Sequence, residues 1–327
     1  MTVRPVDIRD LVLLGVSCAA SAVVGVLVPF VGIPIAVLAL ALITLRFNAW
    51  TGAVVAVLAT AVAVLVIGEP LQGLVILPAL LVAGPAATVA LKRRPALQVL
   101  AVVVAVMFVS AVTADVVAAA LQHMSLVQWR LAEVALLKKA MLASAKPNAN
   151  ITAAQAKAAA DLVGTTWMRY WPAIYFMING LTGLLSVKIV AWAGNRAGAG
   201  TSTLPPIAEL DLNANWAWPV IGGIALMAAG MFTHEPDGWV YVTGYNLVLA
   251  SRCVLFFQGI GDFSALYRKA GVGRVTRGIG YVFLTFSEIV VPVVSLLGLV
   301  DLFTNLRKLP RDGAGAPRSV ESGAGSV

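Results

Sequence analysis

The chain has 327 residues, of which 60% are apolar and only 12% are charged, and its mean hydropathy is +0.92. This balance excludes an ordinary soluble globular domain and is typical of a protein that crosses a membrane several times. The net charge of +8 could suggest a nucleic-acid surface, but the basic residues gather at alternate ends of the apolar runs, so we expect no nucleic-acid partner.

Continuous apolar runs follow one another along most of the chain. A bilayer core about 30 Å thick takes roughly 20 apolar residues per helix. Runs suited to that length lie at 11–29, 49–68, 72–91, 96–121, 171–193, 216–232, 239–267 and 278–305, with a shorter run at 33–45. Because the runs do not alternate as barrel strands do, the sequence predicts an all-α, polytopic membrane helix bundle of about 8–9 transmembrane helices.

Lysines and arginines predict the orientation of these spans. They fall at alternate ends of successive spans: Arg4, Arg9, Arg46, Lys92, Arg93, Arg94, Lys188, Arg196, Arg268, Lys269, Arg274 and Arg277. The short loops at the opposite ends, 31–32, 69–70 and 233–238, carry no lysine or arginine. By the positive-inside rule we expect a multi-pass protein of the bacterial cytoplasmic (inner) membrane, with its N-terminus in the cytoplasm.

A long polar interruption divides the chain. We expect an N-terminal membrane half at 1–121 with about five helices, an extracytoplasmic amphipathic helical insert at 122–170, a C-terminal membrane half at 171–307 with about four helices, and a disordered tail at 308–327. The insert either closes the bundle on the outer membrane surface or forms a lid over an outward-facing cavity.

The insert itself reads as two helices. Apolar residues gather toward one side of the first: Leu126, Trp129, Leu131, Val134, Leu137 and Met141. Most of the other side is charged: Arg130, Glu133, Lys138 and Lys139. The sequence at 146–148 breaks this helix, and a second one begins after Asn150 with Thr152 as its cap.

Few charged residues lie inside the spans. Asp115 and Lys188 sit near helix ends, so we expect both to reach an interface. Arg252 and Glu288 lie deep in two antiparallel spans at similar depth, so we expect them to pair. The pair is either a structural lock between two helices or part of a polar cavity. Its candidate neighbours are Tyr245, Asn246, Gln258 and Tyr281.

The segment 278–305 has two interpretations. As one span it would place the basic tail outside, against the positive-inside rule. Alternatively, Pro292 breaks it into two half-helices that turn back, which a membrane accepts only where protein or water covers the backbone. We favour nine crossings over eight. Its second acid, Asp301, looks like a helix-end residue that pairs with Arg307 or Lys308 near an interface.

Two early spans carry small residues at every fourth position, which lets membrane helices approach closely. These candidate helix-packing or partner-binding rows are Gly15, Ala19 and Ala22 in the first span, and Gly52, Ala56 and Thr60 in the third. Whether the partner is another helix of this chain or a second protein stays open.

Motifs of catalysis and cofactor binding are missing from the sequence. The chain has only two histidines, and no metal-ligand spacing, nucleophile elbow or phosphate-binding loop accompanies them. We therefore expect no enzymatic activity, no metal and no cofactor.

The C-terminal spans resemble the YybS-like family of predicted bacterial membrane proteins, domain of unknown function 2232. The resemblance rests on LVLASRCVLFFQGIGDFSALYRKAG and LGLVDLFTNLRK, and more loosely on the stretch at 204–206. The positions that match the family signature are Gln258, Gly259, Gly298, Asp301 and Arg307.

The N-terminal half looks like the S component of energy-coupling-factor transporters. This resemblance implies an unidentified small molecule as ligand, and a transmembrane coupling protein and ATPases as partners besides the lipid bilayer. Our leading hypothesis is therefore a bacterial inner-membrane protein that binds or transports a small solute. The alternative is a non-transporting membrane scaffold or assembly factor whose buried charges hold helices together.

Overall fold

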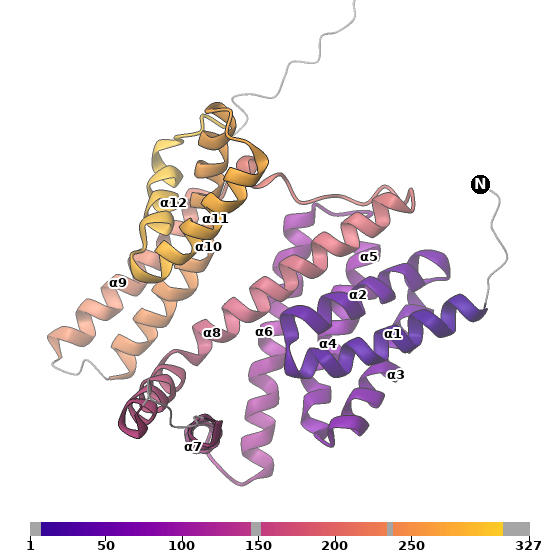
Figure 1. Ribbon diagram of the computed structural model, residues 1–327, viewed down its shortest axis with the longest axis horizontal. Helices are drawn as coiled ribbons and strands as arrows, with labels where there is room; N and C mark the ends of the chain where they lie inside the picture. The colour runs from indigo at the N-terminus through magenta and orange to yellow at the C-terminus, as the bar shows by residue number, and fades with distance from the viewer. Residues whose placement is uncertain (1–7, 145–151, 234–237, 310–327) are drawn as a thin grey trace, which may run out of the picture. The chain divides into compact units, whose positions relative to one another are not determined.

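The structure is a computed structural model and describes residues 8–144, 152–233 and 238–309 (Figure 1). These residues form helices, turns and loops without any strand. Among them, eight helices are long and apolar enough to cross a membrane, and one bent helix pair makes a ninth candidate. The predicted all-α membrane helix bundle is thus confirmed. The chain divides into two compact units between Leu204 and Pro205.

Most helices of the first unit match the apolar runs. They are α1 (Ile8–Leu27), α2 (Pro29–Arg46), α3 (Ala49–Ile67), α4 (Gly73–Leu81), α5 (Ala87–Ala90), α6 (Ala96–Leu121), α7 (Leu126–Ser144) and α8 (Ala153–Arg196). A short 3₁₀ turn, Pro70–Gln72, precedes α4, and the π-helical turn Val82–Ala86 joins α4 to α5, so the fourth apolar run is assembled from short helical pieces.

Small residues bring the first helices of this unit together. At the α1–α2 crossing, a Cβ on Gly32 would overlap the backbone of Gly25. Gly52, Ala56 and Thr60 are buried in the unit, and a Cβ on Gly52 would overlap the Thr44 hydroxyl. These three residues therefore pack within the chain.

The row on α1 is less uniform. Ala22 is fully buried and Ala19 partly so. Gly15 is half-buried, and a Cβ there would have no neighbour within 4 Å. The close approach of α1 to α2 thus depends on Gly25, one turn beyond the row that we predicted.

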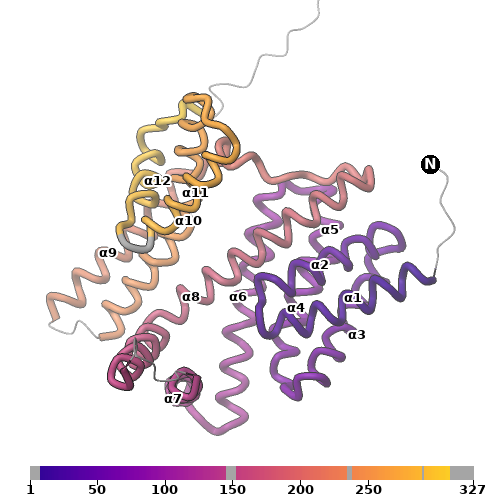
Figure 2. Tube along the Cα trace, in the orientation of Figure 1, coloured from indigo at the N-terminus to yellow at the C-terminus, as the bar shows by residue number. Residues whose placement is uncertain are grey.

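The polar insert does not end where its composition changes. The break expected at 146–148 lies outside the described residues, but α8 begins at Ala153 as predicted, and Thr152 and Gln155 form a capping box at its start. α8 continues through residue 170 to Arg196 without interruption, and its tube is continuous in Figure 2. The second half of the insert and the following span are therefore one helix of 44 residues.

The second unit has four main helices: α9 (Ala217–Phe232), α10 (Trp239–Lys269), α11 (Arg274–Val290) and α12 (Val293–Thr304). Two 3₁₀ turns, Ile207–Glu209 and Ala214–Trp216, precede them. The chain bends by 98° between α11 and α12. The break lies at Pro292, where the second interpretation of 278–305 expected one. A bent pair of this kind is either one broken span or a re-entrant loop, so the turn-back and the count of nine crossings stay predictions. The expected tail at 308–327 lies almost wholly outside the described residues.

Candidate functional site

The first unit buries a charged cluster around Arg130 of α7. The Arg130 side chain is only 1% exposed and forms ion pairs with Asp115 of α6 and, at 2.6 Å, with Glu133 one turn further along α7. It also donates to the Tyr175 hydroxyl on α8 at 2.9 Å. Three helices thus contribute to the cluster. Two carboxylates face one guanidinium, so the formal charge of the group is −1.

Aromatic rings surround the same guanidinium. Its carbon lies 4.4 Å from the centre of the Trp171 ring and 4.8 Å from that of Tyr175. Trp167 and Trp171 each meet the Tyr175 ring edge to face. A cation held between aromatic faces and carboxylates is stabilised by both, more strongly where water is excluded. We call Asp115, Arg130, Glu133, Trp171 and Tyr175 the Arg130 cluster.

This cluster corrects two expectations. We assigned Arg130 to the charged outer side of the insert helix, but it is buried, whereas Leu131, assigned to the apolar side, is 53% exposed. We expected Asp115 to reach an interface, but it is buried against Arg130. The other five residues that we assigned to the apolar side of α7 are buried or half-buried, so its inward face is as predicted except that Arg130 lies in it and Leu131 does not. Arg130 faces inward because Asp115 of α6 pairs with it there.

The predicted pair of Arg252 and Glu288 is present in the second unit. Arg252 Nε donates to Glu288 Oε1 at 2.9 Å, and the guanidinium also bonds the Glu288 carbonyl. Glu288 Oε2 accepts the backbone N–H groups of Val294 at 3.0 Å and Ser295 at 3.2 Å. The carboxylate therefore caps the start of α12 as well as binding α10, and it links three helices at the 98° bend.

The other neighbours that we expected for this pair make contacts elsewhere in the second unit. Asn246 donates to the Val242 carbonyl of its own helix. The Tyr245 ring stacks on Tyr241, and the Tyr281 ring lies against Tyr267. Gln258 takes part in a different cluster.

That second cluster surrounds Arg307, whose side chain is 3% exposed. Arg307 pairs with Asp262 of α10 at 2.7 Å and with Asp301 of α12 at 2.8 Å, and Asp211 lies 3.9 Å away. Its NH1 group donates to the Leu210 carbonyl at 2.7 Å and reaches the Ala208 carbonyl at 3.3 Å. The guanidinium thus fastens the segment before α9 to α10 and α12.

Gln258 bridges the acids of this second cluster. Its amide donates to Asp301 at 2.7 Å and to Asp211 at 3.2 Å, and its oxygen accepts the Leu212 N–H at 3.1 Å. We call Asp211, Gln258, Asp262, Asp301 and Arg307 the Arg307 cluster. Asp301 pairs with Arg307 as predicted, but it is fully buried rather than near an interface.

No group of three potential metal ligands of the kind that holds an ion occurs in the part of the chain that the structure describes. Both cysteines are free, Cys18 on α1 and Cys253 on α10.

Comparison with known protein families gives one result that decides the family. A family model described as "Predicted membrane protein (DUF2232)" matches residues 16–302, which is most of the chain. The chain belongs to the DUF2232 family. No curated protein and no solved structure matches it. DUF2232 membership identifies a membrane protein without an assigned activity.

The five positions that we matched to a family signature in the sequence come together in the second unit. Gln258, Asp301 and Arg307 form the centre of the Arg307 cluster. The two glycines lie where α10 and α12 cross: a Cβ on Gly259 would overlap the Val294 carbonyl, and one on Gly298 would overlap the Leu255 carbonyl. The glycines thus allow the backbone contact that brings Asp301 to Gln258.

Several residues of the two clusters escaped the sequence reasoning. Asp211 and Asp262 lie near helix ends, where a carboxylate is unremarkable, and only the fold brings them to Arg307. Trp171 and Tyr175 follow each other by one helical turn, which could have indicated a shared face with Asp115 opposite.

Proposed function

We propose that this protein is a non-enzymatic membrane protein that binds a small solute carrying a positive charge, and that the Arg130 cluster is its binding site. One observation carries the proposal. The cluster holds a carboxylate in excess, beside aromatic rings, and part of it is open to solvent.

The charge balance favours a cationic group. Arg130 and Asp115 neutralise each other in the buried part of the cluster, with side chains 1% and 11% exposed. Glu133 remains as the second carboxylate, and its side chain is 33% exposed. A cation that approaches Glu133 from the solvent side would complete the neutralisation of the cluster.

The aromatic residues favour the same class of ligand. Trp167 and Trp171 are each half-buried, and both meet the Tyr175 ring. Electron-rich ring faces beside a carboxylate are the usual environment for ammonium and quaternary ammonium groups. The buried Nε of Arg130 has no hydrogen-bond partner among the described residues, so an acceptor on the ligand could also bind there.

The location supports the role of the insert as a lid. α7 supplies Arg130 and Glu133, while α6 and α8 supply the other members of the cluster. A second contact, between Lys138 of α7 and Asp161 of α8 at 2.9 Å, fastens the lid at its surface. The resemblance of the N-terminal half to S components supports solute binding in this unit.

The test is native mass spectrometry of the purified protein, followed by binding assays with ammonium solutes and their neutral analogues. We expect a retained cationic molecule in the wild type and roughly tenfold weaker binding in Glu133→Gln, because one charged contact is lost. The control, Glu69→Gln, removes an exposed carboxylate of the first unit that lies outside the cluster and outside the α7–α8 contacts, and should bind normally. Retention of a neutral or anionic molecule, unaffected by Glu133→Gln, would contradict the proposal.

A scaffold role is the second candidate, favoured by the second unit. There Glu288 and Arg307 each join three segments of the chain. Glu288 accepts hydrogen bonds from the first N–H groups of α12, and Arg307 donates to backbone carbonyls. Replacing Arg252 or Glu288 alone tests this second candidate in the second unit. Loss of folding indicates a structural lock, whereas a folded variant that no longer retains a co-purifying molecule indicates a binding site in the second unit.

A further inference from the structure

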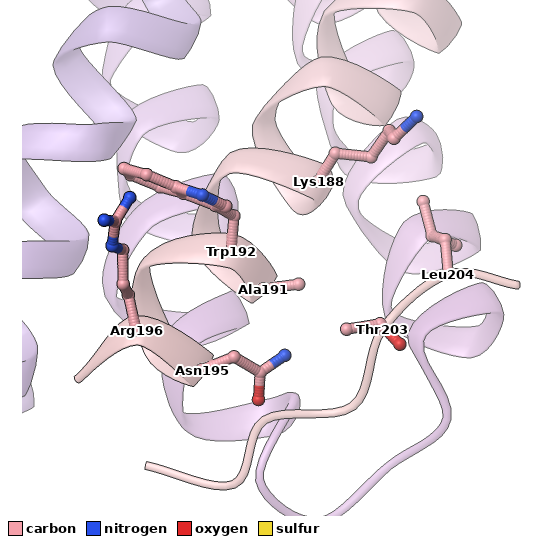
Figure 3. Close-up of a pocket in the computed structure, with 7 residues that line it drawn as sticks. All are labelled: Lys188, Ala191, Trp192, Asn195, Arg196, Thr203 and Leu204. Carbon is pink, nitrogen blue, oxygen red and sulfur yellow. The ribbon is translucent and has the colours of Figure 1, made fainter. Parts of the chain in front are cut away.

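The C-terminal end of α8 forms a pocket that the Arg130 cluster does not explain. Figure 3 shows the pocket between the last turns of α8 and the segment that follows. Its volume is about 330 Å³, and its walls include Lys188, Trp192, Asn195, Arg196, Thr203 and Leu204. Asn195 and Thr203 point toward each other across it, while Lys188 and Arg196 lie at opposite sides.

The segment after α8 is fixed in place. The Thr201 hydroxyl donates to the Ala191 carbonyl of α8 at 3.0 Å. Ser202 binds two carbonyls before α6, those of Leu91 at 2.8 Å and Arg94 at 2.7 Å. Hydrogen bonds to α8 and to the segment before α6 therefore hold the wall of the pocket that follows α8 in a defined position.

Its charge is positive. Lys188 and Arg196 line the pocket, and the segment to which Ser202 binds carries three further exposed cations, Lys92, Arg93 and Arg94. Among the residues that the structure describes, no acidic side chain forms an ion pair with any of these five cations. Positive charge gathered in this way attracts anions and raises their local concentration.

Its other walls suit the boundary of a bilayer. Trp192 is 54% exposed, and the Arg196 guanidinium lies 5.5 Å from the centre of its ring. Indole rings concentrate where the hydrocarbon region of a membrane meets the headgroups. Leu204 and Ala191 add an apolar wall that suits the upper part of an acyl chain.

We propose that this pocket binds the headgroup of an anionic phospholipid. Asn195 and Thr203 would donate hydrogen bonds to its phosphate oxygens, Lys188 and Arg196 would attract its negative charge from opposite sides of the pocket, and its glycerol and first methylene groups would lie against Leu204 and Ala191. Basic pockets between membrane helices are a known environment for such headgroups. This site is independent of the solute site, because it uses none of the Arg130 cluster.

The test is native mass spectrometry of the full chain in detergent after titration with phosphatidylglycerol or phosphatidylcholine. We expect phosphatidylglycerol to bind at least about tenfold more tightly, and the double variant Lys188→Gln with Arg196→Gln to lose about 10- to 30-fold of that affinity. The matched control, Lys139→Gln with Lys157→Gln, removes the same charge from exposed positions on α7 and the start of α8 and should bind as the wild type does.

A third arm separates a lipid from free phosphate, whose chemistry the cations would also accept. Inorganic phosphate at millimolar concentration should leave lipid binding nearly unchanged. If phosphate alone displaces the lipid completely, the site is for a soluble anion and the proposal is wrong. Equal binding of the two lipids, or equal losses in the double variant and its control, would also overturn it. A melting temperature within the range of the wild type shows that the double variant is folded.

Discussion

The Arg130 and Arg307 clusters each place one arginine among carboxylates from several segments, yet they differ in what they leave open. Arg307 meets three aspartates and two backbone carbonyls, and Asp262 and Asp301 are 2% and 0% exposed. Arg130 rests on aromatic rings, and its second carboxylate, Glu133, stays one-third exposed. A fully buried cluster of charges locks segments together, whereas a cluster with an accessible carboxylate can still bind a ligand. The predictions below test this contrast.

The largest loss of stability is expected from Arg307→Ala. Removal of this side chain leaves Asp262 and Asp301 buried without their cation, and breaking a buried pair in this way costs about 3–5 kcal/mol. Thermal or denaturant unfolding in detergent measures the loss. Lys308→Ala, at the exposed next position, is the control and should unfold like the wild type. A stable Arg307→Ala protein would show that the cluster does not lock the second unit.

The α10–α12 crossing tests the same lock through its backbone. We expect Gly298→Ala to destabilise the protein by about 1–3 kcal/mol, since the new Cβ would overlap the Leu255 carbonyl and force the helices apart. Gly278→Ala on α11, where a Cβ meets nothing within 4 Å, should instead stabilise by about 0.5–1 kcal/mol. If the two variants shift the unfolding midpoint equally, close packing at the crossing is not required.

A smaller loss of stability is expected from a substitution in the Arg130 cluster. Asp115→Asn removes one of the two carboxylates, but Arg130 keeps Glu133, Tyr175 and the ring faces, so the cost should be about 1–2 kcal/mol. Unfolding measurements alongside Arg307→Ala give the comparison directly. A cost as large as that of Arg307→Ala would mean that both clusters are locks.

The smallest expected effect is that of pH on the docking of α7 and on solute binding. Burial raises the pKa of the Glu133 carboxyl above its usual 4.5, Asp115 raises it further, and Arg130 opposes both. A carboxyl with a raised folded-state pKa favours the folded state more as pH falls, and this gain is lost as pH rises through the raised value. Acidification should therefore slightly strengthen the docking of α7 and weaken the binding of a cationic solute. Hydrogen exchange of α7 and solute titrations over the same pH range should move in opposite directions; parallel changes would contradict the proposed role of Glu133.

Local patterns predicted part of this structure well. Apolar runs located most of the spans, Thr152 marked the start of α8, and helix length alone placed Arg252 and Glu288 at matching depth. The Arg130 cluster was missed because the periodic pattern of a helix predicts that apolar residues face inward and charged residues face outward. Arg130 is charged and yet buried, so the pattern assigns it to the wrong side. Its burial depends on Asp115, which comes from another helix.

The Arg307 cluster was only half predicted for a similar reason. The link between Asp301 and Arg307 is local, six residues along the chain. The burial of Asp301 depends on Asp211 and on the carbonyls before α9, which lie about a hundred residues earlier and approach only after the chain folds. Contacts over such separations leave no periodic pattern in the sequence.

The unbroken length of α8 has one more consequence. Trp171 and Trp192 are 21 positions apart in this helix, which corresponds to about 32 Å of axial rise and so nearly equals the hydrocarbon thickness of a typical bilayer. We therefore expect the two indole rings to lie at opposite surfaces of the membrane. A change in bilayer thickness is then expected to change the tilt of α8. Because both the proposed solute site and the proposed lipid pocket include residues of α8, the same change in tilt would move both.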